Sequence, residues 1–292
     1  MNTKRRSNWY IYLITFVITG VLLFIVSQAL LSSYYSSQQA QNVNDQQNHG
    51  TIFVPDSNYN FTMLLMLGKS IDATPDYYMT LTYRADKSQF TVMPYLGNSY
   101  IGGSTLKGAY NSGGAESVMR AISAGTGIEI NKYIRFTAST AVQLFDTVGN
   151  TTLSVPKNIK YENDDHTLTI INSGTSIFSG KQLYEYLSLP DYGEKDMQYP
   201  CKVHATAISS FINQNFTDIS ESSLDEYMDF IIGFTSTNIT EQDYLSKKAA
   251  LLYSFDDAPT PCDYYIPYGD LSGNEYVISE GSVDSIKDIV NR

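Results

Sequence analysis

The sequence has few of the residues on which most catalytic and metal sites depend. It contains two cysteines and three histidines in 292 residues. Cys201 and His204 could supply two metal ligands, but no second Cys/His pair completes a zinc site. No Gly-x-Ser-x-Gly nucleophile motif occurs. Gly68-Lys69-Ser70 resembles the end of a phosphate-binding P-loop, but Met63 stands where that loop needs glycine. We therefore predict neither a metal site nor a nucleotide site.

Positive charge is also scarce. The chain has 19 Lys and Arg residues against 30 Asp and Glu residues, a formal net charge of −11. Three of the basic residues are Lys4, Arg5 and Arg6, so the chain that follows them carries −14. Such acidity excludes nucleic-acid binding through a general electrostatic footprint. Any phosphate group must be held by a few local donors, because arginine occurs afterwards only at positions 84, 120, 135 and 292.

One long apolar run is present, from Tyr10 to Leu31. About twenty such residues span a bilayer core, and the preceding basic residues place the N-terminus in the cytoplasm. We expect a single-pass protein of the cell membrane, with residues 1–9 cytoplasmic, a transmembrane helix at 10–31, a flexible tether at 32–54 and an extracytoplasmic domain at 55–292. The alternative is a cleaved signal peptide ending near Ala29, which would also export the domain.

Strand and helix patterns alternate in the exported part. Apolar or alternating stretches indicate strands at 61–67, 78–83, 89–93, 130–136, 152–155 and 275–279. Helical spacing indicates helices at 115–123, 179–187, 202–216, 222–234, 240–254 and 283–290, and a further one that Thr137 or Ser139 caps and Gly149 ends. This order predicts a layered α/β domain. Outside the cytoplasm a disulfide between Cys201 and Cys262 is permitted, and the sequence leaves that pairing open.

Five segments of the domain, in order, resemble the LytR-CpsA-Psr family of bacterial cell-envelope proteins. The most specific runs from Gly127 to Gly149 and includes Gly-Ile-Glu-Ile-Asn-Lys-Tyr-Ile-Arg-Phe. The others are Met63-Leu-Leu-Met-Leu-Gly68, Leu106-Lys-Gly-Ala-Tyr-Asn-Ser-Gly-Gly114, Gly180-Lys-Gln-Leu-Tyr-Glu-Tyr-Leu187 and Ser236-Thr-Asn-Ile-Thr240. The resemblance covers the chain from about Phe61 to its end, and the single N-terminal span agrees with it.

The resemblance implies a three-layer α/β/α sandwich with a mixed central sheet, preceded by one transmembrane helix, and a deep apolar cleft for a polyprenyl chain. It also implies a phosphotransferase that moves a lipid-linked glycopolymer onto peptidoglycan. In the family, several arginines grip the pyrophosphate, and aspartates assist them or bind magnesium. The implied partners are a polyprenyl-phosphate lipid or its glycopolymer, peptidoglycan and the membrane, without nucleic acid.

The chain departs from the family at the arginine positions. Pro75-Asp76-Tyr77-Tyr78 stands in place of Arg-Ser-Asp-Thr, Pro94-Tyr95-Leu96 in place of Pro-Arg-Asp, Leu187-Ser188-Leu189 in place of an arginine segment, and Met197 to His204 in place of Arg-x-x-Arg-Gln. Arginine grips phosphate with a planar fork, which neither tyrosine nor lysine reproduces.

Other residues could replace these arginines. The catalytic candidates are Lys69, Asp72 and Lys107. The groups that could hold a lipid phosphate are Lys69, Lys107 and Arg120. We favour a membrane-anchored cell-envelope protein that binds a polyprenyl-phosphate-linked glycopolymer or a related lipid without efficient catalysis. The alternative is a divergent phosphotransferase, which would require magnesium. A third interpretation is a surface domain that binds another wall protein.

Overall fold

The computed structural model describes residues 53–162, 166–217, 219–258 and 261–291. From Val54 onward these residues form one compact unit. The expected cytoplasmic segment, the membrane span and most of the tether lie outside the described ranges. Within those ranges, no helix is both long enough and apolar enough to cross a membrane.

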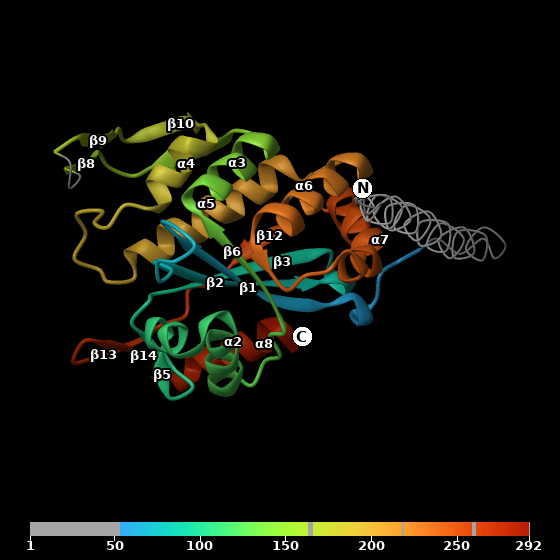
Figure 1. Ribbon diagram of the computed structural model, residues 1–292, viewed down its shortest axis with the longest axis horizontal. Helices are drawn as coiled ribbons and strands as arrows, with labels where there is room; N and C mark the ends of the chain where they lie inside the picture. The colour runs from blue at the N-terminus through green and yellow to red at the C-terminus, as the bar shows by residue number, and fades with distance from the viewer. Residues whose placement is uncertain (1–52, 163–165, 218, 259–260, 292) are drawn as a thin grey trace, which may run out of the picture. The chain divides into compact units, whose positions relative to one another are not determined.

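A six-stranded mixed sheet lies at the centre of the unit, in the order β11-β6-β1-β2-β3-β12 (Figure 1). Its strands are β1 (Phe61–Gly68), β2 (Tyr77–Arg84), β3 (Gln89–Tyr95), β6 (Lys132–Thr137), β11 (Ser236–Thr237) and β12 (Cys262–Tyr264). The strands β1, β2 and β3 form an antiparallel meander, while β6 runs parallel to β1 and β12 runs parallel to β3. The mixed α/β class expected from the sequence is confirmed.

Helices cover both faces of this sheet (Figure 1). On one face lie α2 (Leu106–Thr126) and α8 (Glu280–Asn291); on the other lie α3 (Ala138–Val148), α4 (Gly180–Leu187), α5 (Tyr199–Asn215), α6 (Glu221–Phe234) and α7 (Glu241–Asp257). The two faces of β1 differ in burial. Leu64 and Met66 are almost fully buried in the core shared with α2 and α8. Met63, Leu65 and Leu67 point the other way and are only half-buried, because a cavity lies over that face.

Most helices begin at a serine or threonine whose side chain accepts a hydrogen bond from a free backbone N–H of the first turn. These N-caps are Thr105 for α2, Thr137 for α3, Ser179 for α4, Ser220 for α6 and Thr240 for α7. Gly149 ends α3 with a φ of 143°, which favours glycine. The predicted cap and end of this helix are therefore confirmed.

Helix α2 differs from its prediction. The sequence pattern places Gly113-Gly114 at the start of a helix, and a helical segment does follow the pair; the prediction missed the preceding segment from Leu106, which joins it across a kink at the two glycines. Gly114 adopts φ 63° and ψ −153°, a conformation that side chains strongly disfavour. Each half of α2 is a regular helix, so the glycine pair marks a change of direction within α2.

Smaller sheets surround the central one, and the sequence pattern missed most of their strands. They pair β13 (Gly269–Ser272), β14 (Glu275–Ile278), β4 (Ser99–Ile101) and β5 (Ser104–Thr105) in one sheet, β10 (Gly174–Phe178) with β7 (Thr151–Val155), and β8 (Ile159–Glu162) with β9 (Leu168–Ile171). These strands have at most five residues, so their alternation is too brief to distinguish them from loops. Strands β7 and β14 were predicted.

Candidate functional site

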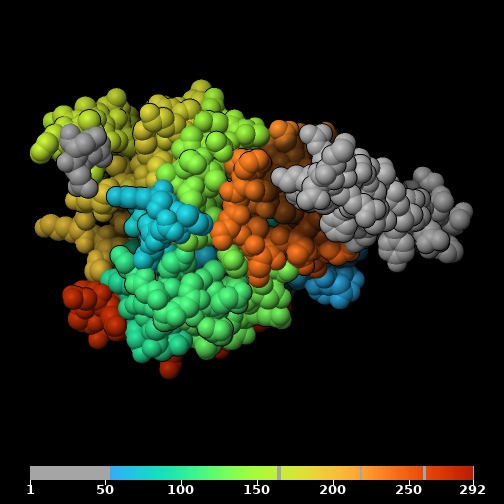
Figure 2. Space-filling model, in the orientation of Figure 1, coloured from blue at the N-terminus to red at the C-terminus, as the bar shows by residue number. Residues whose placement is uncertain are grey.

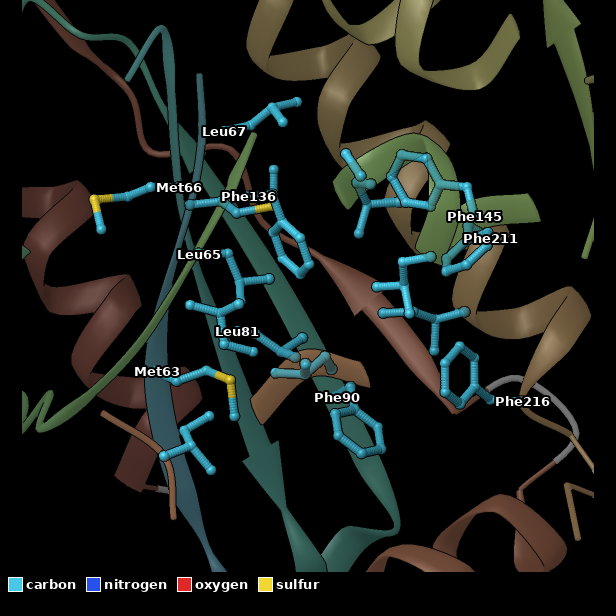
Figure 3. Close-up of a pocket in the computed structure, with 18 of the residues that line it drawn as sticks. Met63, Leu65, Met66, Leu67, Leu81, Phe90, Phe136, Phe145, Phe211 and Phe216 are labelled. Atoms are coloured by element: carbon cyan, nitrogen blue, oxygen red, sulfur yellow. The ribbon is translucent and has the colours of Figure 1, made fainter. Parts of the chain in front are cut away.

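An apolar cavity of about 220 Å³ lies between the central sheet and the helices α3, α5, α6 and α7. The sheet contributes side chains such as Met63, Leu65 and Leu81, and the helices contribute Phe145, Phe211 and others (Figure 3). In Figure 3 the strand side chains face the helix side chains across the open space. Among the described residues that line it, none is an acid, lysine or arginine.

The helical walls of this cavity follow from residue spacing. On α5, the lining residues are His204, Ile208, Phe211 and Ile212. On α6 they are Leu224, Met228 and Ile231. Steps of three and four residues place side chains on one face of a helix, so each helix presents an apolar stripe to the sheet. The full lining also includes Phe61, Met66, Leu67, Tyr77, Met79, Phe90, Ile134, Phe136, Ala141, Leu144, Leu187, Phe216, Ile239, Leu251 and Phe255.

A second cavity of about 300 Å³, which we call the mouth, lies at the end of β1. Its lining is Leu67, Gly68, Lys69, Asp76, Tyr77, Tyr95, Leu96, Gly97, Tyr184, Ser188, Leu189, Pro190, Pro200, Cys201 and His204. Three of these residues, Leu67, Tyr77 and His204, also line the apolar cavity. The two cavities therefore meet at these three side chains, and a ligand that occupied both would pass them.

His204 and Tyr77 form an aromatic pair at this meeting point. Their ring centroids are 4.3 Å apart in an edge-to-face arrangement. His204 Nε2 lies 2.8 Å from the carbonyl oxygen of Leu187. Because a carbonyl only accepts, Nε2 carries the proton and donates this bond. Burial lowers the pKa of His204 to about 4, so the ring is neutral near pH 7.

The loop between β1 and β2 is held in place by Arg135 of β6, a role that the sequence did not reveal. Its guanidinium donates hydrogen bonds to the backbone carbonyls of Ser70 and Ala73. It also lies 5.0 Å from the ring centroid of Tyr110 on α2. Arg135 can contact this loop because its strand, β6, pairs with β1, which the loop follows. This pairing is seen only in the structure. Arg135 is a positioning residue for the loop that carries Lys69 and Asp72.

The structure brings some of the predicted site residues together and separates others. Lys69 is exposed and lines the mouth. Lys107 is exposed, and its backbone lies beside the mouth. Its N–H donates a 2.8 Å hydrogen bond to the carbonyl oxygen of Gly97, a residue of the mouth. Asp72 is exposed in the loop after β1, which stands at the molecular surface in Figure 2 (cyan), and it lines neither cavity. Arg120 lies beyond the break in α2, where it donates a 2.8 Å bond to Ser117.

The four segments that the sequence analysis set against the family's arginine motifs meet at the mouth. Tyr77, Tyr95, Ser188, Cys201 and His204 belong to these segments, and all line this one cavity. The sequence alone could not show that they meet. Because tyrosine, serine, thiol and neutral imidazole carry no charge, the mouth cannot offer a multi-arginine grip on a pyrophosphate.

The disulfide that the sequence left open is not formed, since Cys201 and Cys262 are free, buried thiols. The backbone N–H of Cys262 donates a 2.7 Å bond to Asn213, which lies twelve residues after Cys201 on α5. At about 1.5 Å per residue, that separation is about 18 Å, well beyond the Cα distance that a disulfide spans. Burial raises the pKa of the Cys201 thiol to about 12, so it is protonated and inert.

The described residues contain no group of three or more His, Cys, Asp or Glu side chains arranged to hold a metal ion. Asp76 is the only carboxylate among the described residues of the mouth. The arrangement is therefore suited to holding a long apolar molecule in the inner cavity and a small, polar group in the mouth.

Comparison with known proteins agrees with this architecture. The LytR-CpsA-Psr family model matches residues 30–254. A protein of Eubacterium siraeum, described as a transcription regulator, shares 52% identity and a TM-score of 0.80, over 83% of this chain and 95% of that chain. B. subtilis TagV shares the fold at a TM-score of 0.64 and 14% identity, over 79% and 95% of the two chains. TagT bound to LI-WTA gives a TM-score of 0.61 at 10% identity, over 82% and 93%.

No curated protein matches the sequence significantly. The family model covers well over half of the chain, and the protein from E. siraeum is similar along nearly its whole length. Together with the ordered motifs and the apolar cavity over the central sheet, these matches show that the chain belongs to the LytR-CpsA-Psr family of cell-envelope proteins.

Proposed function

We propose that this protein is anchored in the cell membrane by one N-terminal helix and that its extracytoplasmic domain binds a polyprenyl-phosphate-linked glycopolymer or a related lipid without transferring it efficiently. The domain has the three-layer α/β/α arrangement that the family resemblance implies. Its role is in assembly or regulation of the cell wall, where the lipid chain occupies the apolar cavity and the polar group lies in the mouth.

The observation that carries this proposal is the contrast between the two cavities. The inner cavity is lined by apolar and aromatic side chains that favour a hydrocarbon chain over water. The mouth, where the reacting phosphate would lie, has one lysine, Lys69, and one acid, Asp76, among its described residues. Preorganised positive charge is usually the largest catalytic contribution when negative charge develops. A site that has the apolar cavity but little positive charge at the mouth is suited to binding a lipid rather than to transferring its glycopolymer.

The description of the E. siraeum protein as a transcription regulator does not lead us to propose DNA binding. A formal net charge of −14 after the first nine residues opposes contact with the phosphate backbone. TagT, by contrast, is bound to LI-WTA in its structure, and its likeness to this chain in fold supports a ligand of the cell envelope.

The alternative function is a divergent phosphotransferase. It would use Lys69 and Lys107 in place of the arginines and Asp72 or Asp76 with magnesium. Lys69 at the mouth favours this alternative. A lysine is a point charge and does not make the two parallel hydrogen bonds that arginine makes to phosphate, so a much slower reaction is expected.

Lipid extraction tests the binding function. Full-length protein, purified from its native membrane, should carry a lipid that organic extraction and mass spectrometry identify. Ala141→Phe adds an aromatic ring inside the apolar cavity and should abolish this lipid. Ser176→Phe adds the same ring at an exposed position of β10 and should retain it. Equal lipid content in the two variants would contradict the proposed binding site.

A transfer assay separates binding from catalysis. Lipid-linked glycan donor, peptidoglycan acceptor and magnesium are incubated with this protein or with a family member that has the arginines. We expect turnover at least about a hundredfold slower for this protein, a loss comparable to removal of one charge-stabilising donor. Comparable turnover, abolished by Lys69→Ala or Lys107→Ala, would establish the alternative instead.

A further inference from the structure

The described residues of the mouth contain two charged side chains of opposite sign. Lys69 and Asp76 are both exposed at its rim, and their formal charges cancel. The other polar side chains of the mouth, apart from His204, are the hydroxyls of Tyr77, Tyr95, Tyr184 and Ser188 and the Cys201 thiol, all of them neutral near pH 7. A phosphorylated head group would enter this space with at least one negative charge, and the exposed lysines, Lys69 at the rim and Lys107 beside it, would compensate it only weakly.

Local carboxylates make the mouth less favourable still for an anion. Burial raises the pKa of the Tyr77 hydroxyl above its ordinary value, and the nearby Asp76 carboxylate raises it further. Burial also raises the pKa of the Cys201 thiol, and the carboxylate of Asp196 raises it further. Each group resists ionisation partly because a negative charge already lies close by. A phosphate would experience the same repulsion.

The hydrogen-bonding character of His204 points in the same direction. Its Nε2–H is already donated to Leu187, and its neutral ring leaves Nδ1 as an acceptor. The oxygens of a carboxylate or of a fully deprotonated phosphate, the main form above pH 7, only accept, so they find no donor on this ring. An alcohol O–H can donate to Nδ1 while its oxygen accepts from a tyrosine hydroxyl such as that of Tyr77.

We propose that the ligand of this site is a long-chain lipid alcohol, whose hydrocarbon chain fills the apolar cavity and whose uncharged hydroxyl lies at the meeting point of Tyr77 and His204. This inference rests on the proposed lipid-binding function and, of the two ligands proposed there, selects the related lipid over the phosphate-linked glycopolymer. The site selects against the phosphorylated form of the same lipid, because its charge is uncompensated and its oxygens meet an acceptor.

The test compares three lipids with one identical polyprenyl chain: the free alcohol, the monophosphate and the carboxylic acid. Each is added in equal amounts to full-length protein in detergent micelles, and native mass spectrometry measures the bound fraction at pH 7.5. We expect the alcohol to be retained at least about tenfold more than either anion. Equal or tighter binding of the monophosphate would overturn the inference but leave the proposed function intact. Binding of none of the three would overturn both.

Variants at the mouth sharpen the test. Ser188→Arg places a guanidinium at a half-buried position of the mouth. It should shift the preference at least about tenfold toward the monophosphate, whereas Ser188→Gln, of similar length without charge, should not. His204→Phe keeps an aromatic ring but removes the acceptor, and should lower retention of the alcohol specifically. Unchanged preferences in Ser188→Arg and His204→Phe, both folded by circular dichroism, would show that head-group charge and this acceptor do not set selectivity.

Discussion

Acidification should destabilise the folded domain through protonation of His204, in a pH range where few other groups contribute. Burial lowers the pKa of His204 from an ordinary 6.5 to about 4. The unfolded chain therefore binds a proton that the folded chain excludes as the pH falls below 6.5, and stability is lost progressively until about pH 4. A difference of about 2.5 pH units corresponds to about 3 kcal/mol in total, of which about 2 kcal/mol is lost by pH 5.

The ion-paired carboxylate of Asp243 titrates below this range. Partial burial of Asp243 acts to raise its pKa, but hydrogen bonds from Lys132 and Thr240 outweigh it and lower the value to about 2. The stability that Asp243 contributes is present above its ordinary pKa of 3.8 and is lost only below it. Asp243 therefore does not contribute to a change in stability between pH 7 and pH 5.

Thermal unfolding of the full chain, followed by circular dichroism at pH 7 and pH 5, measures this effect. A loss of about 2 kcal/mol lowers the Tm by roughly 4–8 °C in a domain of this size. His204→Gln has no titrating group and should show little difference between the two pH values. His166→Asn removes an exposed histidine at φ 63°, a conformation that asparagine tolerates, and should behave like the wild type. An identical pH dependence in His204→Gln and wild type would refute the reasoning.

Three further predictions concern the scaffold of the site. The Nζ atom of Lys248 in α7 lies 2.6 Å from Glu221 and 2.8 Å from Asp225, both in α6, and the lysine side chain is 11% exposed. Lys248→Met should lower the free energy of unfolding, measured by urea titration, by about 1–3 kcal/mol. Lys181→Met removes an exposed 3.7 Å pair and should change this free energy by less than about 0.5 kcal/mol. Thiol labelling of the denatured, unreduced protein should find both Cys201 and Cys262 free, and labelling of the native protein should be slow; detection of fewer than two thiols would contradict their separation along α5. Gly114→Ala should destabilise the protein by about 1–3 kcal/mol, because it forces a side chain into a backbone conformation that costs that much; an unchanged Tm would mean that the break in α2 relaxes without cost.

The sequence was sufficient to predict the long elements that have a clear period. The apolar run at 61–67 became β1 because both faces of that strand are covered, one by α2 and α8 and one by the helices across the cavity. Thr137 and Gly149 delimited α3 because capping is a local property of a few consecutive residues. The glycine pair in α2 was correctly read as preceding a helical segment, but the segment from Leu106 before it was missed, because its small and polar residues give no clear apolar period.

The candidate site was predicted only in part. Lys69 was placed correctly at the end of β1, because the end of a strand can be read from its pattern. His204 was noted as a weak metal candidate, and its role at the meeting of the two cavities depends on Leu187 and Tyr77, which belong to α4 and β2. Arg135 received no role from the sequence, although it holds the loop that carries Lys69, because only the pairing of β6 with β1 places it beside that loop.

The sequence by itself determined the family, the alternation of strands and helices, the acidity of the domain and its scarcity of arginine, since each is a property of local order or composition. Only the tertiary structure decided that the segments containing Tyr77, Tyr95, Ser188 and His204 form one mouth and that an apolar cavity lies beneath it. The physical reason is that a cavity is a property of spacing between elements. Side chains that each obey an ordinary apolar pattern either interlock or leave a space, according to how far apart the sheet and the helices are held.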